Sequence, residues 1–199
     1  MSEFPLLATR AAPPRRAQPN GWWGMALFLC AEATLFFGVI ATYFYLDFDA
    51  RSWPPPGIPR PAVVLPLVAT GVLVAMSLPM ARAARAARTG RRGRVLALIG
   101  FAMVVQGCYF ALQIILFRHD LNSFSPRQSA YGSVYFTLLA LHHAHVLLGI
   151  ALDVGILSAV AVAGLTDYWQ TGVRALALYW HVINAIAIAV VLTQLSPSL

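Results

Sequence analysis

The sequence predicts an all-α membrane protein whose chain crosses the bilayer five times. Of its 199 residues, 59% are hydrophobic and 11% are charged, whereas an ordinary soluble domain is roughly a quarter charged. The apolar residues gather in five stretches. Each stretch is long enough for a helix that crosses a hydrocarbon core about 30 Å thick, which takes about 20 residues. A soluble protein of this length would leave too much apolar surface facing water.

The five predicted spans are separated by connections of distinct character. The spans cover residues 22–46, 62–81, 95–117, 131–163 and 173–195. The first connection is rich in proline, the second is basic, the third is polar and the fourth is a short turn. The fourth span is longer than one crossing needs, so we expect it to tilt or to project from the bilayer. Residues 196–199 form a C-terminal tail.

The distribution of arginine predicts the orientation. When the spans alternate, ten of the fourteen arginines fall on one side and four on the other. The richer side is expected to face the cytoplasm, so the N-terminus is cytoplasmic and the C-terminus is outside. Residues 1–21 are predicted to be a disordered cytoplasmic tail. They are not read as a cleaved signal, because arginines and prolines fill them and the apolar run that follows is too long.

The second connection, residues 82–94, is the most basic part of the chain. It contains Arg82, Arg85, Arg88, Arg91, Arg92 and Arg94. Such a cluster is first of all a topology signal, and binding to anionic lipid is the second interpretation. Although the formal charge of +7 could also suit nucleic acid, the arginines lie between apolar spans, and this position favours lipid.

Four ionisable residues fall inside the spans, where such groups are costly and are functional candidates by default. At 1.5 Å per residue, Glu32, His142 and His181 each lie about 13–16 Å from one face, near the middle of the membrane. His145 lies one turn deeper than His142 on the same helix. Shared depth allows these side chains to meet only if their helices are adjacent and suitably rotated.

Two interpretations of these residues remain open. They form a proton relay or ligand site, or they form buried hydrogen bonds that fix helix packing. A metal site built from His142, His143, His145, Glu32 and His181 is disfavoured, since a di-metal bundle centre needs several carboxylates. We therefore expect no metal, no cofactor and no catalytic residue in this chain.

Three further residues are expected to be inert. Asp153 lies far along the fourth span, so we expect it to emerge at the inner interface and to be solvated. Cys30 and Cys108 fall inside apolar runs, so they are interpreted as buried thiols, not as a disulfide or metal ligands.

Four motifs in colinear order give the chain a family resemblance. It is similar to subunit III of the cytochrome c oxidases, whose pattern includes W-G-M…S-E-x-x-x-F, W-P-P-x-G-I, Y-G-S…H-G-x-H-V-x-x-G and Y-W-H-F-V-D. The residues that match are Trp23, Gly24, Met25, Glu32, Phe36, Trp53, Pro54, Pro55, Gly57, Ile58, Tyr131, Gly132, Ser133, His142, His145, Val146, Gly149, Tyr179, Trp180 and His181. The match spans about residues 22–195.

The resemblance implies a function that the residues alone do not give. It implies an accessory core subunit in the short five-helix bacterial form, without the first two helices of the seven-helix type. Haems and copper are expected in partner subunits. The chain would contact subunit I directly, subunit II and other subunits would complete the complex, and cytochrome c would be its electron donor. Bound phospholipid, support of proton uptake, stability during turnover and a place in the bacterial cytoplasmic membrane are implied as well.

The resemblance also shapes the residue predictions. Glu32, His142, His145, His181 and Asn184 are expected to be structural or proton-related. Trp22, Trp23, Trp53, Trp180 and Arg174 are candidates for lipid or interface contacts. The chain departs from the family at three of its positions: Asn184 replaces an aspartate, His143 replaces a glycine and Arg174 replaces an acidic residue. The ionic network at that end is therefore expected to differ.

Several alternatives stay open. Within the family, the chain could serve a quinol oxidase or a nitric oxide reductase, although the W-P-P-x-G-I loop favours the cytochrome c type. Outside it, a small membrane metalloenzyme or a transporter is less favoured, and the sequence has no internal repeat of the kind that transporters often contain.

Overall fold

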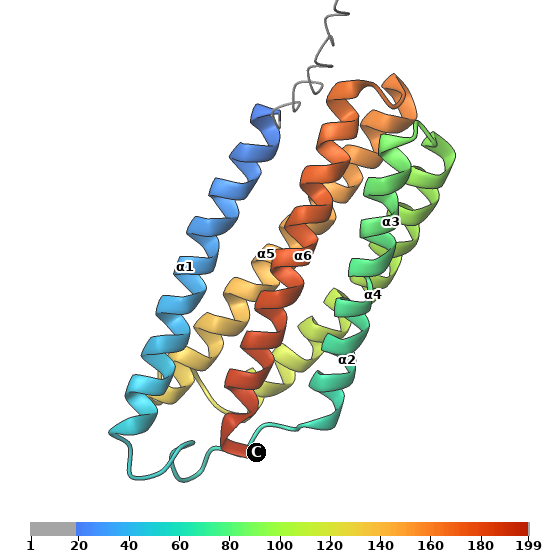
Figure 1. The fold of residues 1–199 in the computed structure, drawn as a ribbon. Coiled ribbons are helices and arrows are strands. Elements are labelled where there is room, and N and C mark those ends of the chain that lie inside the picture. Colours follow the sequence, from blue (N-terminus) through green and yellow to red (C-terminus); the bar gives the residue numbers. More distant parts are fainter. Residues whose placement is uncertain (1–18, 199) are drawn as a thin grey trace, which may run out of the picture.

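The structure is a computed structural model that describes residues 19–198. This part of the chain contains six α-helices and one short 3-10 helix (Figure 1). The helices are α1 (Asn20–Phe48), α2 (Val64–Ala75), α3 (Ser77–Arg88), α4 (Arg92–Ser123), α5 (Ala130–Ala163), α6 (Asp167–Leu195) and η1 (Ser196–Ser198). The predicted tail over residues 1–21 lies almost entirely outside the described residues, and α1 already includes residues 20 and 21.

The prediction of five membrane-crossing helices is confirmed. Five segments of the described chain are long and apolar enough to span a membrane, with α2 and α3 together forming one of them. The interruption at Met76 was not predicted. It follows from Pro79, which has no N–H to donate to the carbonyl of Ala75 and whose ring crowds that carbonyl. The chain therefore ends α2 at Ala75 and starts α3 at Ser77.

Several helices extend further than the hydropathy predicted, and the last three connections are correspondingly shorter. The predicted basic loop over 82–94 is wrong in most of its length, because α3 continues to Arg88 and α4 starts at Arg92. The polar connection is reduced to residues 124–129, and the last turn to residues 164–166. Arginine is compatible with helix interiors, so charge marks the edge of the apolar layer and not the end of the helix.

The two ends of the bundle differ in chemistry. At one end lie the α3–α4 connection, the start of α1 and the α5–α6 turn (Figure 1); we call this the arginine end. At the other end lie the long connection from α1 to α2 and the C-terminus (Figure 1); we call this the proline end. There Trp53 packs edge to face against Tyr43 and Tyr131, with ring centroids 5.2 and 5.0 Å away.

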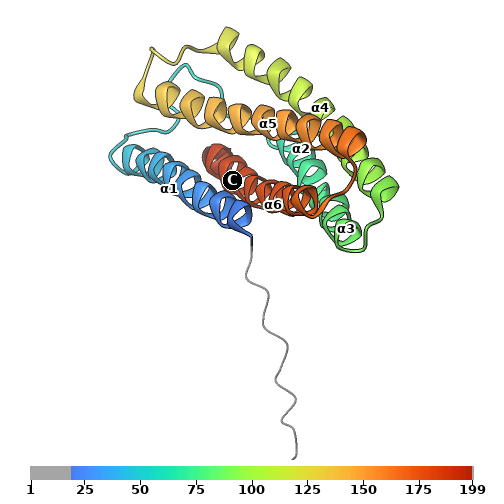
Figure 2. The ribbon, with the colours of Figure 1, turned by 90° about the horizontal axis from the view of Figure 1, so that it is seen from above.

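Helix α6 is the central element, and α1 stands at one side. Seen from above, α6 lies between α1 on one side and α2 and α3 on the other, with α5 behind it (Figure 2). In its most apolar stretch 61% of the α6 residues are buried, against 11% for α1. Among the described helices, α1 packs only on α5 and α6, and it leaves most of its apolar surface uncovered.

Candidate functional site

Glu32 and His145 meet where α1 crosses α5. The Oε2 atom of Glu32 lies 2.9 Å from Nε2 of His145. The glutamate side chain is 21% exposed and the histidine side chain 10%. Because α1 is held only by α5 and α6, this polar contact lies at the seam that attaches it.

The hydrogen bonds of His145 define where one proton resides. Its Nδ1 atom lies 2.7 Å from the carbonyl oxygen of Leu141. A carbonyl can only accept, so Nδ1 carries a hydrogen and donates it. The contact between Nε2 and Glu32 then needs exactly one more proton, which sits on the carboxyl or on the imidazole. The pair is therefore a shared-proton unit with no net charge.

Neighbouring aromatic residues fix this pair from two sides. Phe36, one turn after Glu32, packs edge to face on the His145 ring, with centroids 5.1 Å apart. On α6, the hydroxyl of Tyr179 donates to the backbone carbonyl of His145 at 2.6 Å. Three helices thus meet at one histidine, and its ring has little freedom to rotate.

His142 takes part in a different network. Its Nε2 atom lies 3.2 Å from the hydroxyl of Tyr109 on α4, and Gln113 donates to the same hydroxyl at 2.8 Å. Since Gln113 supplies a hydrogen to that oxygen, the tyrosine hydrogen is free to point at His142. The structure therefore does not unite His142 with His145 and Glu32, although the two histidines are three residues apart.

A small cavity adjoins the His142 network. It has a volume of about 40 Å³ and extends among α2, α4, α5 and α6. Its polar lining comprises Thr70, Tyr109, Gln113, Asp120, Tyr135, His142 and Gln194. The Tyr135 hydroxyl donates to Oδ2 of Asp120 at 2.8 Å. A run of polar side chains therefore leads from the proline end to mid-bundle.

The remaining predicted residues lie apart. His143 is buried against the rings of Phe110 and Phe117. His181 is on the exposed side of α6 and does not join the other histidines. Asn184 is buried and donates from Nδ2 to the hydroxyl of Ser77 at 2.8 Å, which ties α6 to the start of α3.

The expectation for Asp153 is wrong. Its side chain is fully buried, and its Oδ1 atom accepts a hydrogen bond from Nε1 of Trp180 at 3.1 Å. Asp153 lies on the face of α5 that packs against α6. Its depth in the membrane, counted from the sequence, does not show which face of the helix it is on. The expected burial of Cys30 and Cys108 is also wrong, since both thiols are exposed on the isolated chain, although neither forms a disulfide.

Removing the indole donor tests the Asp153 contact. Trp180→Phe keeps most of the ring but leaves the buried carboxyl without its hydrogen bond, so we expect a loss of about 1–3 kcal/mol in the free energy of unfolding. The measurement is the thermal unfolding midpoint of the detergent-solubilised protein. Trp23→Phe is the control, because Trp23 is 55% exposed. Equal midpoints for the two variants would contradict a stabilising role.

The predicted surface candidates have varied environments. Trp22 is half-buried and Trp23 exposed, and their rings touch edge to face at 5.1 Å near the start of α1. Trp53 is half-buried in the aromatic group at the proline end. Trp180 is fully buried and cannot contact lipid, so that assignment is corrected, and Arg174 is half-buried on α6.

Sequence reasoning missed the polar face of α4. Gln106, Tyr109 and Gln113 are all buried, and their spacing of three and four residues places them on one face of that helix. Two glutamines seven residues apart inside an apolar span could have indicated a buried polar face on this helix. Within residues 19–198, no three His, Cys, Asp or Glu side chains are grouped to hold a metal ion.

Comparison with known proteins identifies the family. The profile of cytochrome c oxidase subunit III matches residues 17–194. The chain belongs to the cytochrome c oxidase subunit III family. The residues that join α1, α5 and α6, which include Glu32, His145 and Tyr179, all lie inside the matched region.

Relatives of the subunit III chain serve more than one kind of oxidase. Subunit 3 of the cytochrome bo(3) ubiquinol oxidase of Pseudomonas aeruginosa is 29% identical over 86% of this chain and 82% of its own length. Cytochrome c oxidase subunit 3 of Bacillus subtilis is 28% identical over 84% and 81%. The Struthio camelus subunit is 28% identical over 82% of this chain, which spans only 64% of its length. The chain is an accessory subunit of a haem–copper oxidase complex.

Proposed function

We propose that this chain is subunit III of a bacterial cytochrome c oxidase and supports the catalytic subunit I beside it in the cytoplasmic membrane. The observation that carries the proposal is the family match, and the residues that join α1 to the bundle lie within the matched region. Haems and copper reside in partner subunits, and cytochrome c delivers electrons to the complex. This chain contributes stability during turnover, support of proton uptake, and bound phospholipid.

Two grooves beside α1 support a role in lipid binding. One, of about 440 Å³, lies between α1 and α5 toward the proline end and includes Val39 and Val134. The other, of about 580 Å³, lies between the start of α1 and α5–α6 at the arginine end and includes Ile156 and Trp169. Acyl chains can lie along such apolar surfaces, and another subunit can cover the apolar side of α1 that this chain leaves exposed.

Purification of the complex tests this function. We expect the tagged chain to copurify from solubilised membranes with a haem-containing subunit, and the reduced complex to show haem bands in its visible spectrum. The complex should oxidise reduced cytochrome c. A colourless preparation of this chain alone, from membranes that contain an active oxidase, would contradict the proposal.

The Pseudomonas aeruginosa relative favours a second candidate, a quinol oxidase. The same purified complex separates the two donors. Oxidation of ubiquinol but not of cytochrome c would select the quinol type and overturn the donor proposed here. The accessory role of the chain would be unaffected.

The proposed orientation puts the arginine end in the cytoplasm. It rests on the excess of arginine at that end, which is the usual mark of the cytoplasmic side. We expect alkaline phosphatase fused after residue 199 to be active and the same enzyme inserted at Gly90 to be inactive. The reverse pattern of activities would overturn the orientation.

A further inference from the structure

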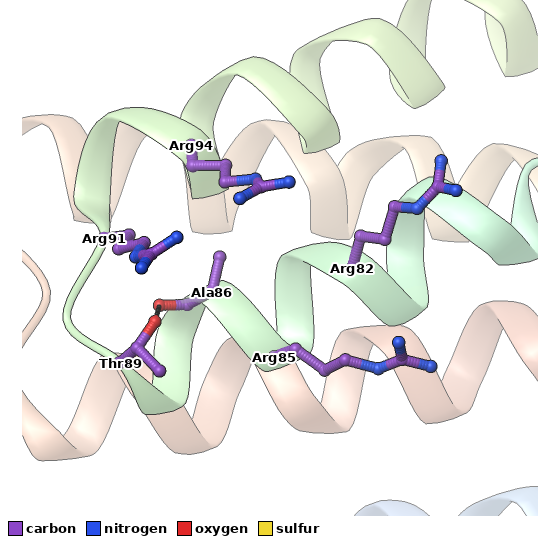
Figure 3. A pocket seen from close by; sticks show the side chains of 6 residues that line it. All are labelled: Arg82, Arg85, Ala86, Thr89, Arg91 and Arg94. Atoms are coloured by element: carbon purple, nitrogen blue, oxygen red, sulfur yellow. Dashed lines mark hydrogen bonds between the residues drawn. The ribbon is translucent and has the colours of Figure 1, made fainter.

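Four arginines surround one pocket at the arginine end of the bundle. Arg82 and Arg85 come from α3, Arg91 from the connection directly before α4, and Arg94 from the first turn of α4 (Figure 3). The pocket has a volume of about 320 Å³. Thr89 completes the lining, and its hydroxyl is already bonded to the carbonyl of Ala86 at 3.1 Å. The remaining donors around the pocket are guanidinium groups.

Among the residues that the structure describes, no side chain neutralises the positive charge of this pocket. No acidic side chain of that part of the chain lines it. Within residues 19–198, none of the four arginines forms an ion pair with an aspartate or glutamate. Like charges gathered in one place repel each other, although solvent weakens the repulsion between these exposed side chains. An anion bound among the guanidinium groups would remove that repulsion.

The two other arginines of the cluster are set apart from the pocket. Arg92 donates to the carbonyl of Ala161 at 2.6 Å, so it is committed to holding α4 against the end of α5. Arg88 is exposed on the last turn of α3 and does not line the pocket. Four of the six arginines of the basic cluster therefore line one pocket. A topology signal alone would not require the arginines to be grouped in this way.

The position of the pocket identifies the source of the anion. It lies at the end of two membrane-crossing segments, where lipid headgroups are found. Directly toward mid-bundle from it, Leu78 on α3 is 53% exposed and Phe101 on α4 is 57% exposed. Arg82 lies about 9 Å below the end of α3 and can extend its guanidinium toward the headgroup level. A ligand with phosphate above and acyl chains below matches both surfaces.

We propose that this pocket binds the headgroup of an anionic phospholipid, with its acyl chains on the apolar surface of α3 and α4. Guanidinium groups bind phosphate oxygens in a bidentate manner, and basic pockets between membrane helices are suited to lipids of this class. Four positive charges fit best a headgroup with two phosphates, such as diphosphatidylglycerol. The site is separate from the grooves beside α1 and does not depend on the electron donor.

A pair of matched double variants in the intact oxidase complex tests the proposal. Arg82→Gln/Arg94→Gln removes two pocket arginines. Arg88→Gln/Arg118→Gln removes the same charge outside the pocket and is the control. After delipidation, binding of diphosphatidylglycerol, phosphatidylcholine or inorganic phosphate is measured by native mass spectrometry and by thermal shift. All four positions are exposed, so neither variant disturbs the core.

We expect the pocket variant to bind diphosphatidylglycerol on the order of tenfold more weakly than the control variant. Phosphatidylcholine binding should be the same in both. Arg82→Lys/Arg94→Lys, which keeps the charge, should retain most of the affinity. Equal loss in the two double variants, or no loss in either, would overturn the proposal. Equal protection by inorganic phosphate at the same concentration would assign the site to a soluble anion and overturn the lipid assignment.

Discussion

Replacing Gly149 by alanine is expected to destabilise the helix bundle by about 1–3 kcal/mol. A β-carbon at this position of α5 would lie 2.6 Å from Cζ2 of Trp180 and 2.9 Å from Cε1 of Tyr179. Both rings are fully buried, so neither can move aside without disturbing its neighbours. The helices α5 and α6 would have to separate at the same level as the Asp153 and His145 contacts.

The measurement is the thermal unfolding midpoint of the solubilised chain, together with its yield in the assembled oxidase. Gly155→Ala is a matched control on the same helix, because a β-carbon there would meet nothing within 4 Å. The control should match or slightly exceed the wild type, since alanine favours helix over glycine. If Gly149→Ala behaved like Gly155→Ala, the close approach of α5 and α6 would not be what limits stability.

Removing the carboxyl of Glu32 should have the next largest effect. Glu32→Ala leaves the Nε2 atom of His145 without its partner in a largely apolar seam, which costs about 1–3 kcal/mol. Because α1 has few other polar contacts with the bundle, we expect its attachment to weaken. The oxidase should assemble less well and should inactivate sooner during turnover. The measurements are subunit stoichiometry after purification and the lifetime of oxygen consumption.

A glutamine at the same position separates a packing role from a proton role. Glu32→Gln can donate from its amide to Nε2 of His145, so it preserves the hydrogen bond but cannot exchange the shared proton. If the pair only fixes α1, Gln should restore assembly and lifetime. If the proton itself matters, Gln should fail in turnover while assembling normally. Leu35→Ala, an exposed truncation on the same helix, is the control, and unchanged behaviour of Glu32→Ala would exclude both roles.

The fold was predictable from sequence because one physical quantity determines it. An apolar stretch of about 20 residues has few stable alternatives to a helix in lipid, so the five crossings could be read from hydropathy. The break at Met76 was also readable, since Pro79 cannot continue a helix ladder. The helix ends could not be read. Arg82 and Arg85, which lie inside α3, show that charge ends the apolar layer while the hydrogen bonds of the helix continue.

The site was predictable only in part. The sequence gives the depth of a residue in the membrane, but it does not give the rotation of its helix about the helix axis. Glu32 and His142 were assigned a shared level, with His145 one turn deeper, yet it is His145 that meets Glu32, because the facing of α1 toward α5 depends on packing. The same limit explains His181, which lies near that level and points outward. Asp153 shows the opposite error, since a residue assigned to the interface turns toward Trp180 and is buried. Gln106 and Gln113 could have indicated the polar face of α4, but a search restricted to ionisable residues does not find them.

The central place of α6 has a consequence for biogenesis. Chains enter the membrane from the N-terminus as they are synthesised, and α6 emerges after α1 to α5. Until then α1, which among the described helices packs only on α5 and α6, and the α2–α3 segment lack the surface that most of their contacts need. Closure of the bundle therefore waits for α6, and a stop codon before Asp167 would leave four inserted segments without the helix that joins them.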